Sequence, residues 1–359
     1  MASGGAAVSS TAMVSTPVSG PQLSAGNRRR IQPTLLLGLS LAVLLAAAFA
    51  SVALGARPLS LETVWQALTS ADPANGDHAV VLSRLPRTVA ALLIGAALGL
   101  AGTALQGMTR NPLADPGIMG LNAGAAFAVV TAIYVFGVTS FTGYVWFALA
   151  GTALAALLVY AVASLGREGA TPVKLALAGA ALTAGLTSLL SAVLVSSQQT
   201  LNTFRFWQVG TVSGRGWDVL VPLIPFLAVG AVILLASGRA LNNLSLGDDA
   251  ARGLGQNVAL SRGIMAVGVV LLCGAATAAA GPIAFLGLVI PHLVRGLAGP
   301  DYRWILVISA VLAPVLLLVS DVVGRLILPP GEVPVGIMTA VIGAPVFIAI
   351  IRRRKLAEL

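Results

Sequence analysis

The fold is decided by the stretch RLPRTVAALLIGAALGLAGTALQGMTRNPLADPGIMGLNAGA, residues 84–125. It opens with two arginines, continues as an uncharged apolar run over about 88–108, and ends in the Pro/Gly-rich string NPLADPG at 111–117. Inside the run, GAALGLAG at 95–102 carries small residues, which let helix backbones approach one another closely in a membrane. We therefore predict a membrane-spanning helix within a tightly packed bundle.

The composition of the whole chain extends this prediction. Hydrophobic residues make up 57% and charged residues 9%, and the mean hydropathy is +0.95. So few charges cannot coat a water-soluble core of this size, so we predict an all-α, polytopic membrane protein. The net charge is +9, and the basic residues lie at the ends of apolar runs, where they set the membrane topology. This distribution argues against nucleic acid as a partner.

Ten apolar segments are long enough to be candidate spans. They cover about 34–55, 88–108, 117–137, 144–165, 173–196, 217–237, 263–281, 282–297, 303–323 and 333–351. The eighth is short and contains Pro282 and Pro291, so we expect a broken or partial span there. Residues 1–30 have no apolar period and are predicted to form a disordered cytoplasmic tail, which leaves 31–359 as the transmembrane domain.

The distribution of basic residues predicts the orientation of the chain in the membrane. With ten spans both termini share one side, and 15 of the 21 Lys and Arg residues fall on that side. Cytoplasmic loops are enriched in Lys and Arg. We therefore place both termini, and the polar segment 239–262, in the cytoplasm.

The segment 239–262, RALNNLSLGDDAARGLGQNVALSR, reads as a short helix over about Leu246 to Leu254. Ser245 followed by Asp248 resembles a capping box, and Gly255 supplies a C-terminal stop. The helix dipole favours the acidic residues in its first turn and the arginine near its end.

The apolar stripe of this helix consists of Leu246, Ala250 and Leu254, which is too narrow to stabilise an isolated helix. A helix of this kind needs a surface to dock on. The alternative is an ordinary capped turn between two spans.

Chemical motifs are scarce. The chain has no Walker-type phosphate loop, and its single cysteine and two histidines are too few for a disulfide framework or a metal centre of their own. Asp321 is the carboxylate placed inside a predicted span, and an i,i+4 ion pair with Arg325 explains it locally. His292 is interpreted as a helix-end residue.

Three arginines, Arg84, Arg87 and Arg325, fall on the outer side, which is otherwise poor in basic residues. One interpretation is snorkelling from helix ends. The other is a docking patch for carboxylates of a soluble partner, because the planar guanidinium suits carboxylate binding.

Residues 84–125 resemble the signature of the FecCD-type, BtuC-like permeases, the membrane subunits of binding-protein-dependent (type II) ABC importers for iron–siderophores, haem and cobalamin. The resemblance spans about residues 31–355 and continues in LALAGAALTAG (175–185), LSLGDDAARGLG (244–255), GPIAFLGLVIPHLVR (281–295) and EVPVGIMTAVIGAPVFI (332–348). Two similar strings broken by Pro and Gly, at 111–117 and 290–301, indicate that the chain consists of two related halves. With five spans in each half, the second half would have the inverted orientation in the membrane.

This resemblance implies two permease subunits, identical or paralogous, above two ABC ATPase subunits and beneath a periplasmic or lipid-anchored substrate-binding protein. It implies neither a cofactor nor a catalytic residue in this chain. Ferric siderophore is the expected cargo, cobalamin or haem the alternatives, and a stand-alone secondary transporter or a gated channel the rivals from other classes.

The resemblance also assigns roles by position. Arg84, Arg87 and Arg325 match the arginines that receive the binding protein. The inner gate loop is matched by Thr171, Pro172 and Val173. The ATPase coupling helix, about 245–255, is matched by Leu246, Gly247, Asp248, Asp249, Ala251, Arg252, Leu254 and Gly255.

Overall fold

The computed structural model describes residues 31–355, apart from 118, 139 and 166–170. The chain divides between Arg30 and Ile31, and the described residues belong to the second unit. The predicted N-terminal tail, residues 1–30, lies outside the described residues.

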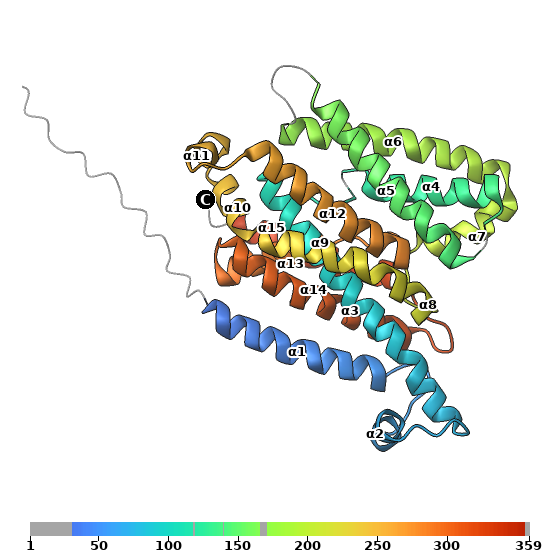
Figure 1. Cartoon of the computed structure of the whole chain (residues 1–359). Coiled ribbons are helices and arrows are strands. Elements are labelled where there is room, and N and C mark those ends of the chain that lie inside the picture. Colours follow the sequence, from blue (N-terminus) through green and yellow to red (C-terminus); the bar gives the residue numbers. More distant parts are fainter. Residues whose placement is uncertain (1–30, 118, 139, 166–170, 356–359) are drawn as a thin grey trace, which may run out of the picture. The chain divides into compact units, whose positions relative to one another are not determined.

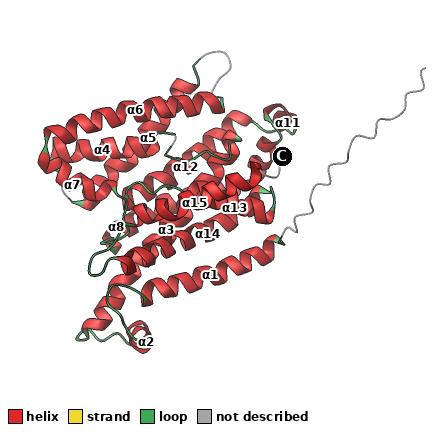
Figure 2. Ribbon diagram, turned by 180° about the vertical axis from the view of Figure 1, so that it is seen from behind, coloured by secondary structure: helices red, strands yellow, loops and turns green. Residues whose placement is uncertain are grey.

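Among the described residues every regular element is a helix (Figures 1 and 2). The helices are α1 (Pro33–Ala53), α2 (Leu61–Thr69), α3 (Gly76–Thr109), α4 (Leu121–Phe136), α5 (Phe141–Ala163), α6 (Pro172–Ser196), α7 (Gln198–Gln208), α8 (Trp217–Leu220), η1 (Val221–Leu223), α9 (Ile224–Ala236), α10 (Gly238–Ser245), α11 (Asp248–Gly253), α12 (Val258–Ala280), α13 (Leu286–Ala298), α14 (Tyr302–Ile327) and α15 (Val335–Lys355).

All ten predicted spans are helices, with α8, η1 and α9 together forming the sixth. Within the described residues, seven of these are long and apolar enough to cross a membrane, and α4, α13 and α15 are shorter apolar helices. The chain is therefore a multi-pass membrane protein. The structure adds α2, α7 and α10, which the span search did not predict.

Helix α3 lies at the centre of the bundle and packs against α14, α12 and α13 (Figure 1). A Cβ at Gly95 would strike the backbone of Pro314, one at Gly99 the carbonyl of Ser309, and one at Gly102 the carbonyl of Gly287. The small residues of this span therefore serve close backbone contact, as predicted.

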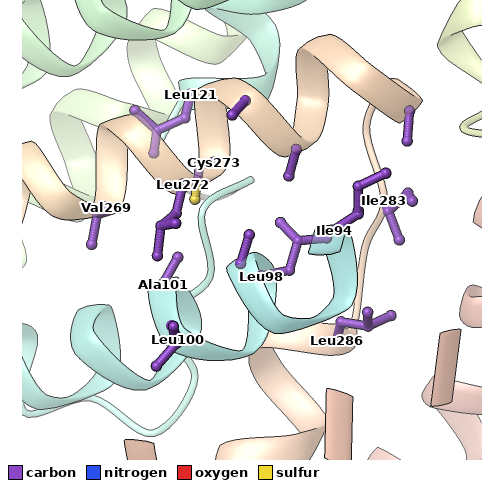
Figure 3. Packing of buried hydrophobic residues seen from close by; sticks show 14 of the residues in the cluster. Ile94, Leu98, Leu100, Ala101, Leu121, Val269, Leu272, Cys273, Ile283 and Leu286 are labelled. Atoms are coloured by element: carbon purple, nitrogen blue, oxygen red, sulfur yellow. The ribbon is translucent and has the colours of Figure 1, made fainter. Parts of the chain in front are cut away.

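Apolar side chains fill the other side of α3. Figure 3 shows Leu98 and Ala101 of α3 beside Leu272 and Cys273 of α12, with Leu286 of α13 nearby. All five belong to the main cluster of buried hydrophobic residues. Cys273 is thus a small core residue.

The eighth span is broken, as predicted. Residues 281–285 are not helical, and Phe285 has φ 71° before α13 begins. Pro291 lacks an N–H, which frees the carbonyl of Gly287 one turn earlier. Gln106 of α3 donates to that carbonyl (3.1 Å) and to the carbonyl of Leu288 (3.2 Å), so a side chain replaces the missing helical bond.

Candidate functional site

A short helix, α11, is present where the coupling helix was predicted, but it begins later than expected. α11 starts at Asp248, because Gly247 has φ +110° and interrupts the chain after α10. The predicted capping box is wrong: Ser245 ends α10, and its hydroxyl donates to the carbonyl of Asn242 (2.6 Å). A glycine-specific backbone angle, and not a side-chain cap, separates the two helices.

The predicted stop at Gly255 is confirmed. Gly255 has φ +79°. Its N–H donates to the carbonyl of Arg252 (2.9 Å), and the N–H of Gln256 donates to the carbonyl of Ala251 (3.0 Å). These are the two bonds of a Schellman motif, which satisfies the last carbonyls of the helix.

Asp248 fastens α11 to two spans. Arg262, near the start of α12, donates to both of its carboxylate oxygens at 2.9 Å. Arg110, the residue after α3, lies 3.4 Å from the same carboxylate. In contrast, Asp249 pairs with Arg252 on the exposed side of α11. The two adjacent aspartates therefore have different roles.

A second attachment joins α10 to α14. The side-chain amide of Asn242 donates to Asp301 (2.7 Å), and its oxygen accepts the N–H of Tyr302 (2.8 Å). Asp301 is also the N-cap of α14. Hydrogen bonds from Arg303, and one from Asn242, lower the pKa of the Asp301 carboxyl to about 2, so it remains ionised at neutral pH.

The outward face of α11 is uncovered. Leu246 is 68% exposed and Leu254 is 61% exposed, and Ala250 between them is exposed as well. Ala251 instead points inward and is fully buried. The three residues of the predicted stripe are exposed, and no described side chain of this chain covers them. They do not lie on one helix, because Leu246 is the C-cap of α10 and Leu254 the C-cap of α11.

A cavity of about 360 Å³ lies beside α11, between the ends of α3, α5, α6 and α12. Thr171, Asp248, Arg252 and Arg262 are among the residues that line it. Of the predicted gate residues, Thr171 caps α6 by accepting the N–H of Lys174 (3.4 Å), and Pro172 is the first residue of that helix. Val173 is exposed and outside the lining.

At the other end of the bundle, Arg84 binds the end of α1. Its guanidinium donates to the carbonyls of Val52 (2.9 Å), Ala53 (2.8 Å) and Arg57 (2.9 Å). The side chain is buried, at 7% exposure. The last carbonyls of a helix have no partner within the helix, and here an arginine from α3 supplies one.

Arg325 of α14 completes this arrangement. It donates to the carbonyls of Ser51 and Leu54, both at 3.0 Å, and is 4% exposed. The predicted i,i+4 ion pair with Asp321 is confirmed at 3.0 Å. Two arginines from α3 and α14 therefore cap α1, a role that the sequence did not reveal because the acceptors are backbone atoms.

Arg87 is the third of these arginines. It donates to both oxygens of Asp321 (2.7 to 3.2 Å), to Glu332 (2.7 Å) and to Ser213 (3.2 Å). Burial alone would raise the pKa of the Glu332 carboxyl, but hydrogen bonds from Ser213 and Arg87 lower it.

The three arginines thus lie at the same end of the bundle, as predicted, and their guanidinium groups donate hydrogen bonds to acceptors of this chain. Docking by Arg84, Arg87 and Arg325 stays a prediction. A partner would have to reach side chains that are buried at two of these positions, Arg84 and Arg325. Arg87 and Glu332, whose side chains are 15% and 34% exposed, form the less buried part of the cluster.

Known proteins resemble this chain in sequence and in fold over most of its length. The chain is 46% identical to the "Probable siderophore transport system permease protein YfiZ" of Bacillus subtilis (strain 168), over 87% of this chain and 93% of the relative. It is also 46% identical to the "Ferric enterobactin transport system permease protein FepD" of Escherichia coli (strain K12), over 88% and 94%.

A solved structure described as "An inward-facing conformation of a putative metal-chelate type ABC transporter" has a TM-score of 0.78 and 29% identity to this chain. The alignment covers 89% of this chain and 99% of that one. A sequence model of the FecCD transport family matches residues 43–353. On this evidence the chain belongs to the FecCD transport family.

Proposed function

We propose that this chain is the permease subunit of a binding-protein-dependent ABC importer that carries a ferric siderophore across the cytoplasmic membrane. The observation that supports the ABC assignment is the segment around α11. Asp248 of this helix is bonded to Arg262 of α12. On the exposed side of the segment, no described residue covers Leu246, Ala250 and Leu254. A partner subunit that binds this face can move the spans behind it.

In this mechanism a separate ATPase subunit binds α11 and hydrolyses ATP. Its movement reaches α12 through Arg262 and α3 through Arg110, while Asn242 carries it to α14. Together, α11 and the preceding α10, which carries Asn242, connect to three spans. A displacement of these two helices can therefore reach the spans and alternately open a transport path. The inner gate in this proposal is the loop of Thr171, Pro172 and Val173, and the cavity that Thr171 helps to line supports it.

The ATPase contact is tested with the variant Leu246→Asp/Leu254→Asp. Both side chains are exposed, so the substitutions spare the core while placing charge on the proposed contact. Co-purification of a tagged ATPase should be lost, and binding-protein capture should persist. The variant Leu165→Asp, at an exposed residue after α5 and outside α10 and α11, serves as the control. Undiminished ATPase binding by the double variant would contradict the proposal.

A second permease subunit covers α6. Its spanning window is 11% buried, the lowest among the long apolar helices of the described residues. It exposes Ala184, Thr187, Ser188 and Ser191, small and hydroxyl side chains that favour close helix contact in membranes. A cysteine at Ala184 should crosslink two copies in membranes, whereas a cysteine at the exposed Leu45 of α1 should not.

The cargo assignment follows the two relatives, which are named for siderophore and ferric enterobactin transport. Proteoliposomes containing this chain, its ATPase and its binding protein should take up a ferric siderophore only with ATP. Uptake of haem or cobalamin instead would contradict the cargo assignment but would leave the proposed ABC transport mechanism unchanged. Uptake by this chain alone, without ATP, would indicate a stand-alone secondary transporter.

A further inference from the structure

Helix α2 carries apolar side chains on two separate faces. The first face, Val64 and Ala67, is buried and packs against Val52, Ala53 and Val81. These contacts fasten α2 to the end of α1 and to the first turns of α3. The position of the helix on the protein is therefore fixed.

The second face consists of Leu61, Trp65 and Leu68, which are 65%, 66% and 42% exposed. They stand at i, i+4 and i+7, so they form one stripe along the helix. At about 100° per residue this stripe lies roughly a quarter-turn from the buried face. The polar residues Glu62 and Gln66, which hydrogen-bond each other at 3.2 Å, occupy the remaining side.

The orientation of α2 differs from that of the spans. In Figures 1 and 2 it is seen nearly along its axis, while α1 and α3 run across the picture, so α2 lies across the direction of the spans. The turn that leads into it is held by the bond from Arg84 to the carbonyl of Arg57 and by the Arg57–Asp77 ion pair.

The surface of α1 leads directly to this helix. Along α1 the large apolar side chains Leu45 and Phe49 are exposed, as expected for a helix that faces lipid, and Leu54, the C-cap residue of α1, is exposed as well. α1 ends at Ala53 and α2 begins at Leu61, so a short turn joins this exposed surface to α2.

We infer that α2 is an interfacial helix whose stripe of Leu61, Trp65 and Leu68 inserts into the bilayer surface at the end of α1. With the buried face against the protein and the stripe toward the acyl chains, Thr63 and Gln66 face the water. The opposite orientation would turn these polar groups toward lipid. Amphipathic helices with Leu and Trp on one face bind membranes in this way, and Trp favours the headgroup level.

The test measures the surroundings of each face in the intact protein. Single cysteines replace Leu61, Trp65 or Leu68, and matched cysteines replace Glu62 or Gln66. Each is spin-labelled in the full chain in liposomes of phosphatidylethanolamine and phosphatidylglycerol. Because native Cys273 is fully buried, the label attaches at the introduced cysteine. Collisions with oxygen report lipid, and collisions with a water-soluble nickel chelate report water.

We expect oxygen to exceed the nickel chelate at 61, 65 and 68, and the order to reverse at 62 and 66. Equal exposure to the nickel chelate at all five positions would overturn the inference. Labels at 61, 65 and 68 that face water until the substrate-binding protein immobilises them would overturn it as well, and would make the stripe a protein-docking face. The measurement needs no transport, so it stands apart from the proposed function.

Discussion

A buried arginine is costly unless its donors are satisfied, and Arg84 satisfies them with backbone carbonyls at the end of α1. Gly55 shows how closely this contact is built, since a Cβ there would meet the Arg84 guanidinium at 2.6 Å. The charge at this position is therefore part of the fold, whatever further role it has toward a partner.

Replacing Arg84 with Gln should destabilise the protein, because the carbonyls of Val52 and Ala53 lose a charged donor. Hydrogen bonds to charged groups contribute about 1.5–3 kcal/mol each. Thermal unfolding in detergent measures the loss. Arg57→Gln is the control, since the exposed Arg57–Asp77 pair contributes at most about 1 kcal/mol. Equal melting temperatures for the two variants would show that the capping bonds add little.

The adjacent residues Asp248 and Asp249 allow a second residue-level prediction. Asp248→Asn should weaken both arginine attachments of α11 and reduce transport-coupled ATP turnover by about tenfold or more, since a charge-assisted bond contributes about 1.5–3 kcal/mol. Asp249→Asn should leave turnover nearly unchanged. ATP turnover with and without loaded binding protein measures the coupling. If both variants behaved alike, Asp248 would have no special role in transmission.

Among the elements, the crossing of α3 and α13 depends on the absence of side chains. Gly102→Ala should destabilise the bundle by about 1–3 kcal/mol, the usual cost of overpacking, because the new methyl group overlaps the Gly287 carbonyl. Gly38→Ala in α1 meets nothing within 4 Å and should be neutral or slightly stabilising. Melting of the two variants in detergent compares them, and a neutral Gly102→Ala would show that the helices separate easily.

The ten spans could be predicted from the sequence because each is a continuous apolar run, and the break at Pro282 and Pro291 because proline removes helical donors. α2 and α7 could not be predicted in this way because they are short and their apolar residues alternate with polar ones. In α7, for example, Phe204 and Trp207 are buried while Phe206 is exposed. The start of α11 was misplaced because the φ of Gly247 is a tertiary feature.

At the site, the sequence predicted which segments lie at each end of the bundle but not which atoms their side chains contact. Asp321 and Arg325 are four residues apart, so their ion pair was predictable. The contacts of Arg84 with α1 and of Arg87 with Glu332 join residues far apart in the chain. No local pattern encodes such contacts.

For the whole molecule, the distribution of basic residues predicts the orientation. A reporter fused after Leu359 should be active in the cytoplasm, because 15 of the 21 Lys and Arg residues lie on the side of the termini. Paired fusions of a phosphatase and a fluorescent protein measure this, and a fusion in the turn between α2 and α3 should give the opposite result. Phosphatase activity from the C-terminal fusion would reverse the proposed topology.

The capping of α1 by Arg325 also bears on how the protein is made. The donor and its acceptor Ser51 are 274 residues apart, so the first span leaves the ribosome long before the residue that completes its end. Arg84 arrives earlier but reaches different carbonyls. A nascent chain that stops before α14 therefore retains unpaired acceptors at the end of its first span. Quality-control proteases that sample such ends would degrade truncated chains and spare finished ones.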